Sequence, residues 1–161
     1  MSEGSDRSAV RIIVAWLLVA LCAGFILWLG GDDFGASATH GLIGPLLEWL
    51  FPDLSNADRW LLHVRIRKLA HAVEYAVLAL LAFRAAFLSF RTKILRVAAV
   101  ALGIAVSVAA ADEARQAASA KRTGSPYDVA LDTGGAVAAL AFVLSILRFR
   151  EQSRRREKDD G

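Results

Sequence analysis

The chain has 161 residues, enough for one domain, and 56% of them are hydrophobic, with a mean hydropathy of +0.45 that is well above the soluble average. A single cysteine, Cys22, excludes an intrachain disulfide. The net charge of +3 does not indicate a nucleic-acid partner, because the basic residues stand mainly at the ends of apolar segments and in the C-terminal tail, where membrane topology explains them.

Four apolar segments have about the 20-residue length that crosses a bilayer. They cover residues 10–29, 69–88, 94–111 and 127–147. The predicted fold is all-α: a polytopic membrane protein with four transmembrane helices in one domain over residues 1–150, followed by a charged tail over 151–161. The membrane bilayer is therefore the first expected partner.

The distribution of Lys and Arg predicts the orientation. Twelve of these residues fall on the side of the two termini and seven on the other side. The positive-inside rule then places both termini in the cytoplasm. The expected location is the cell inner (cytoplasmic) membrane. A cleaved signal peptide, with Ala36-Ser37-Ala38 as its cleavage site, is the rival interpretation, but the first apolar run is long for that role.

The connection over residues 30–68 is the long outer loop. Its apolar stretch over 42–51 is too short to span and contains aromatic residues, which predicts an interfacial or re-entrant segment, in the simplest case an amphipathic helix lying on the outer surface. Ser55 or Asn56 provides an N-cap for a helix that runs from Trp60 into the second span.

The second span begins with polar residues at helical spacing. Lys68, His71, Glu74 and Tyr75 fall on one side of a helix. A lone histidine in such a place would more often be a packing residue, but four polar residues on one sector favour a functional face.

The third span is rich in alanine and ends in acidic residues. Asp112 and Gln116 share one side of the helix and Glu113 points to a neighbouring side. The four-residue spacing of Gly103, Ser107 and Ala111 predicts a seam of small residues for close helix packing.

The fourth span follows a short loop that contains Lys121 and Arg122. Ser125 before Pro126 is a helix start, and Asp128, Asp132 and Gly135 then form a polar and small stripe. Two small-xxx-small pairs, Gly134 with Ala138 and Gly135 with Ala139, predict close packing of this helix.

Together these residues form an ordered pattern: Lys68-x-x-His71-x-x-x-Tyr75-x-x-Leu78, Asp112-Glu113-x-x-Gln116 and Arg122-x-x-Ser125-x-x-Asp128-x-x-x-Asp132-Thr133-x-Gly135. The pattern resembles the VanZ-like family of small bacterial membrane proteins, named for a protein linked to teicoplanin resistance. The resemblance covers roughly residues 68–147. It implies a bacterial membrane protein that affects either glycopeptide susceptibility, and so antibiotic resistance, or the cell envelope. That family often has Asn at the position of Asp132. In this chain the aspartate adds a negative charge to the cluster.

If the three helices pack as neighbours, their polar residues meet at the outer membrane edge, and three accounts compete. In the structural account, bases and carboxylates neutralise one another and lock the helices. In the binding account, Arg122 and Lys121 take the phosphate of an anionic lipid-linked cell-wall precursor. The candidate ligand-binding residues are Lys68, Tyr75, Gln116, Lys121, Arg122, Ser125, Asp128 and Asp132.

The third account is an enzyme acting on a lipid-linked envelope precursor. Here His71 is the general base or acid, Glu74 or Asp112 tunes it, and Asp128 and Glu113 hold a hard divalent cation through oxygen. The candidate catalytic residues are His71, Glu74, Asp112 and Glu113. An accessory role beside a partner enzyme is a further alternative, and a transporter is least favoured because no inverted repeat is evident. The residues leave the ligand, the metal requirement and the oligomeric state open.

Overall fold

The computed structural model describes residues 3–90, 92–119 and 124–159, and every long element among them is a helix. The elements are α1 (Glu3–Leu29), the 3-10 helix η1 (Asp32–Phe34), α2 (Ala36–Leu50), α3 (Asn56–Ser89), α4 (Ile94–Ala118) and α5 (Pro126–Asp159). In the described part of the chain, four helices are long and apolar enough to cross a membrane: Arg7–Leu29, Asn56–Ser89, Ile94–Ala118 and Pro126–Glu157. The predicted fold class, an all-α protein with four transmembrane helices, is confirmed.

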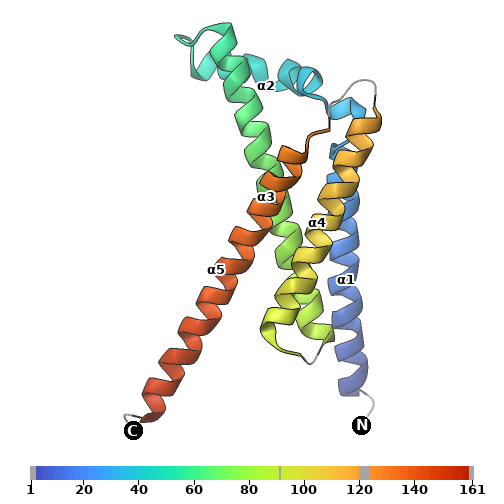
Figure 1. Cartoon of the computed structure of the whole chain (residues 1–161), viewed down its shortest axis with the longest axis vertical. Coiled ribbons are helices and arrows are strands. Elements are labelled where there is room, and N and C mark those ends of the chain that lie inside the picture. Colours follow the sequence, from blue (N-terminus) through green and yellow to red (C-terminus); the bar gives the residue numbers. More distant parts are fainter. Residues whose placement is uncertain (1–2, 91, 120–123, 160–161) are drawn as a thin grey trace.

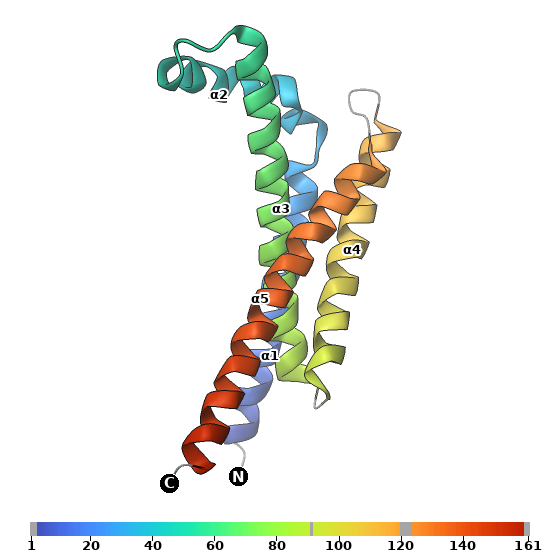
Figure 2. The ribbon, with the colours of Figure 1, turned by 60° about the vertical axis from the view of Figure 1, so that its left-hand side comes forward.

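Helix α3 is the centre of the bundle, because α1, α4 and α5 all pack against it. Figures 1 and 2 show both chain termini at one end of the bundle and α2 at the other. With 34 residues, α3 is about 51 Å long, whereas the hydrocarbon core of a bilayer is about 30 Å thick. Its N-terminal turns therefore extend beyond the core and carry α2 with them.

Two helices begin at the caps that the sequence predicts. The Ser55 hydroxyl accepts a hydrogen bond from the Asp58 N–H (3.1 Å) at the start of α3. The Ser125 hydroxyl accepts one from the Tyr127 N–H (3.2 Å) at the start of α5, where Pro126 occupies the first helical position. These caps fix the entry points of the two helices that carry most of the polar residues.

The small-residue seam of α4 differs from the predicted one. Gly103, Ser107 and Ala111 lie on the exposed side of α4, and a Cβ added at Gly103 would meet no atom within 4 Å. The buried series is instead Ala101, Ala105 and Ala109, which we call the alanine seam. Both series have the same spacing, but only the second continues to Asp112, whose charged group must face protein and not lipid.

Of the two small-residue pairs predicted in α5, the one that contains Gly135 faces the bundle. A Cβ at Gly135 would overlap the backbone of Ala72 in α3, so the two helices approach each other closely here. Gly134 and Ala138 are exposed, and Gly134 has open space around it. The prediction for the Gly134 pair was therefore wrong.

The predicted interfacial segment is α2, which lies across the end of the bundle (Figures 1 and 2). It begins six residues before the predicted segment, at Ala36, and continues through Pro45 to Leu50. Leu42 and Trp49 are 82% and 76% exposed, and Leu46 on the same side is also exposed. An apolar stripe with a tryptophan on a helix across the bundle end suits an interfacial position and not a re-entrant one.

Candidate functional site

The predicted polar residues of α3, α4 and α5 meet at the end of the bundle that carries α2. Helices α3 and α5 descend from this end, whereas α4 rises to it, so the middle turns of α3 and the first turns of α5 face the last turns of α4. We call this cluster the polar site. Its described members are Arg67, Lys68, His71, Glu74, Tyr75, Asp112, Glu113, Gln116, Ser125, Asp128 and Asp132.

The upper layer of the polar site is the ion pair between α3 and α5. Lys68 Nζ lies 2.6 Å from Asp128 Oδ1, and 4.9 Å from the centroid of the Tyr127 ring. The Lys68 and Asp128 side chains are 41% and 32% exposed, so solvent reaches this layer. A lysine donates three hydrogens, so Lys68 retains donors beyond the one used by Asp128.

One turn deeper, His71 and Glu74 form the second pair. His71 Nδ1 lies 3.4 Å from Glu74 Oε2, and each side chain is a quarter exposed. The contact is an ion pair and not a hydrogen bond, because Glu74 Oε2 has no hydrogen-bond partner among the described residues. It places a carboxylate beside one ring nitrogen of a histidine that lines the cavity.

The two acids of α4 have different surroundings. Asp112 is 2% exposed, with its Oδ2 accepting from Gln116 Nε2 (2.8 Å) and its Oδ1 3.7 Å from Arg115 Nη1. A Cβ at Gly30 would overlap this carboxylate, so the turn directly after α1 closes that side. Glu113 points toward α5, where its Oε2 accepts from the Ser125 N–H (2.7 Å).

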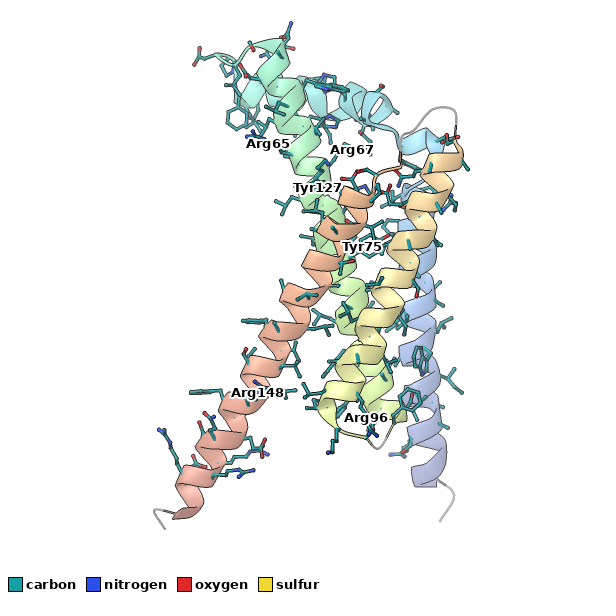
Figure 3. All side chains as sticks on the ribbon, viewed as in Figure 1. Arg65, Arg67, Tyr75, Arg96, Tyr127 and Arg148 are labelled. Atoms are coloured by element: carbon teal, nitrogen blue, oxygen red, sulfur yellow. The ribbon has the colours of Figure 1, made fainter. Side chains whose placement is uncertain are left out.

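Tyr75 and Asp132, like Asp112, are buried members of the polar site. Tyr75 is 0% exposed and Asp132 4%. Figure 3 shows Tyr75 pointing from α3 into the bundle. Within the described parts of the chain, neither the Tyr75 hydroxyl nor Asp132 Oδ1 has a hydrogen-bond partner. Buried polar atoms are nearly always satisfied, so orphaned atoms in one cluster favour a functional over a packing role.

A cavity of about 110 Å³ joins α2, α3, α4 and α5 at the polar site. Because one water molecule needs roughly 10–15 Å³ of such space, the cavity has room for several water molecules or for a comparable volume of ligand atoms. Its walls are Ala36, Val64, Arg67, Lys68, His71, Glu113, Gln116, Asp128, Leu131 and Asp132. Positive groups come from α3 and carboxyl groups from α4 and α5.

The cavity therefore gathers six of the predicted site residues, which are Lys68, His71, Glu113, Gln116, Asp128 and Asp132. Four others stand behind or beside it: Glu74, Tyr75, Asp112 and Ser125. Lys121 and Arg122, the predicted phosphate ligands, lie outside the described residues.

The sequence analysis did not single out Arg67 as a site residue. Its Nη1 donates to the Phe34 carbonyl (2.8 Å) and to the Thr39 hydroxyl (2.7 Å), so it ties the start of α2 to the cavity that it also lines. The signal was present, because Arg67, His71 and Glu74 stand at i, i+4 and i+7 of α3. Arg67 stands next to Lys68 in a basic run, and it was therefore counted only among the residues that determine membrane orientation.

A resident metal centre is not built into the described residues, where no three His, Cys, Asp or Glu side chains group closely enough to hold an ion. The site does present cations and carboxylates to one small cavity at the edge of the apolar spans. Chemically, this arrangement suits a polar ligand with charged groups.

Comparison with known proteins gives one match. A sequence model described as VanZ/LLP1 matches residues 15–148, which is most of the chain and includes every residue of the polar site. No curated protein and no solved structure matches the chain significantly.

Proposed function

Since the chain belongs to the VanZ/LLP1 family, a family of membrane proteins, we propose that its polar site binds the phosphate-bearing headgroup of an anionic, lipid-linked cell-wall precursor. The observation that carries this proposal is the cavity, which lies at the α2 end of the apolar helices beside the partly exposed Lys68–Asp128 pair. Ionisable groups at that depth are costly and usually mark a binding or reaction site.

The cationic wall of the cavity supports an anionic ligand. Arg67 and Lys68 face it from one turn of α3, and His71 faces it from the next turn. An arginine binds phosphate through paired donors and a lysine through a point charge. The carboxyl groups opposite them suit the hydroxyl or amine groups of a headgroup.

We place this site at the outer face of the cytoplasmic membrane, with both termini in the cytoplasm. Two observations support the placement: twelve Lys and Arg residues belong to the side of the termini against seven on the other, and the termini lie at the end of the bundle opposite α2 (Figure 1). Residues 1–150 then form one transmembrane domain and residues 151–161 a cytoplasmic tail. In that position the protein acts on glycopeptide susceptibility, teicoplanin included, by binding the wall precursor.

An enzyme acting on the same lipid-linked precursor is the second candidate, and the His71–Glu74 pair favours it. A histidine oriented by a carboxylate and lining a cavity is suited to general acid or base catalysis. In this role His71 would be the catalytic residue and Glu74 its positioning residue.

A binding measurement tests the headgroup proposal. Purified protein in phosphatidylcholine nanodiscs is titrated with polyprenyl pyrophosphate, and Lys68→Gln is compared with the native chain. The loss of one charge-assisted contact should weaken binding about tenfold. The stability cost should stay below about 1 kcal/mol, because the Lys68–Asp128 pair is partly exposed.

Arg84→Gln is the matched control, since Arg84 lies on the same helix, exposed and far from the cavity. Its affinity should equal that of the native chain. Equal affinities for all three proteins, or no binding at all, would contradict the proposal.

Teicoplanin susceptibility in cells and analysis of the reaction products together distinguish a binding protein from an enzyme. His71→Ala should remain inserted and stable but lose its effect on teicoplanin susceptibility in cells. Incubation of the native protein with lipid-linked precursor, followed by mass analysis, should return the precursor unchanged; a new product that disappears in His71→Ala would establish the enzyme instead.

A further inference from the structure

The inference concerns Asp132, the deepest carboxyl group of the cavity. Its side chain is buried, lines the cavity, and its Oδ1 has no hydrogen-bond donor among the described residues. A buried carboxylate without a donor or counter-ion is costly, so a partner from outside the chain would stabilise it.

Glu113 shares this lack of a counter-ion. Asp128 is neutralised by Lys68, but Glu113 is held by a neutral donor, the Ser125 N–H. In the part of the chain that the structure describes, neither Glu113 nor Asp132 has a basic side chain within ion-pair distance. Two unneutralised carboxyl groups therefore line one cavity of about 110 Å³.

These two carboxyl groups oppose the binding of an anion. A phosphate entering the cavity meets Arg67 and Lys68 on one wall and the carboxyl groups of Glu113 and Asp132 on the other. In a poorly solvated cavity the contact between a phosphate and an ionised carboxylate is strongly unfavourable. A positive charge between the phosphate and the carboxylates would remove this repulsion.

A divalent cation meets this requirement better than an ammonium group, because one ion balances both carboxylates. Mg²⁺ is commonly held by one or two carboxylates together with substrate phosphates and retained water. The described residues group no three His, Cys, Asp or Glu side chains that could hold a metal ion, so the ion also needs oxygen from the ligand.

We propose that the cavity binds a phosphate headgroup and Mg²⁺ together, with Glu113 and Asp132 as the protein's carboxylate ligands to the ion. This proposal rests on the headgroup binding proposed above. Neither ligand binds tightly without the other. By linkage, the factor by which Mg²⁺ increases lipid affinity equals the factor by which lipid increases Mg²⁺ affinity.

The test uses the full chain in phosphatidylcholine nanodiscs with polyprenyl pyrophosphate as the probe. Affinity is measured with excess Mg²⁺ and with EDTA at matched ionic strength. We expect at least about tenfold tighter binding with Mg²⁺, within the usual range of coupling between two ligands. Titration of Mg²⁺ without the lipid should give no measurable binding.

Asp132→Asn gives an effect of opposite sign that a merely structural role would not produce. Removal of the negative charge should let the variant bind the lipid in EDTA more tightly than the native chain does in EDTA. Added Mg²⁺ should then change its affinity less than about twofold. Glu48→Gln, an exposed carboxyl of α2 outside this cavity, is the control and should keep the full Mg²⁺ dependence.

The outcomes separate the two proposals. Equal native affinity in Mg²⁺ and EDTA overturns the cation site but leaves headgroup binding intact, whereas no binding in either condition overturns the proposed function. An undiminished Mg²⁺ dependence in Asp132→Asn, or tight Mg²⁺ binding without lipid, also overturns the joint site. If Asp132→Asn fails to insert, Glu113→Gln serves as the second variant, and it too should lose most of the Mg²⁺ dependence.

Discussion

The alanine seam and the polar site lie on the same helix, α4, and meet at Asp112, yet their contacts are of different kinds. The seam consists of Ala101, Ala105 and Ala109, each at most 1% exposed and packed against neighbouring helices. The polar site consists of ion pairs, hydrogen bonds and two orphaned polar atoms around a cavity. The seam is filled and the site is not, which is the difference expected between a region that holds helices together and one that binds a ligand.

Enlarging a seam residue should give the largest loss of stability. Ala105→Leu adds three carbon atoms where the helices are in contact, and overpacking of this kind should lower the free energy of unfolding by about 3 kcal/mol. Denaturation of the purified protein in detergent measures the loss. Ser107→Leu, two residues away on the exposed side, should cost less than about 0.5 kcal/mol. A larger loss of stability in Ser107→Leu than in Ala105→Leu would show that α4 packs through Gly103, Ser107 and Ala111 instead.

A smaller loss is expected at the contact that lies between the two regions. Gly135→Ala places a methyl group against the Ala72 backbone, so α3 and α5 must separate just below the cavity, at a cost of about 2 kcal/mol. The same detergent denaturation measures it.

Gly134→Ala provides a neighbouring control, because open space surrounds Gly134. Alanine there should be neutral or stabilising by about 0.5–1 kcal/mol through its better helix propensity. If both variants lost equal stability, the close α3–α5 contact would not exist in the membrane.

The smallest change in stability is expected inside the polar site. Tyr75→Phe removes a buried hydroxyl that has no partner among the described residues, so stability should stay the same or rise by about 1 kcal/mol. Headgroup binding in nanodiscs should weaken at the same time. A clear loss of stability would instead assign the hydroxyl a structural hydrogen bond and place Tyr75 with the packed region.

The sequence predicted the composition of the polar site better than its geometry. Helical spacing put Lys68 and His71 on one face of α3, and they line one cavity. The same spacing could not show that Tyr75 and Asp112 stand behind the cavity, or that Arg67 belongs to it. Those facts depend on how far each helix is rotated about its axis, which neighbouring helices decide.

Length and composition alone determined that this chain has four helices able to cross a membrane. In a helix of about 20 apolar residues the backbone groups bond to one another and the side chains are compatible with lipid. Local chemistry likewise determined the caps at Ser55 and Ser125. Tertiary structure decided which small residues pack and which polar atoms remain unsatisfied. Close approach of helices, such as Gly135 against Ala72, depends on pairs of residues distant in sequence, and no single segment encodes its partner.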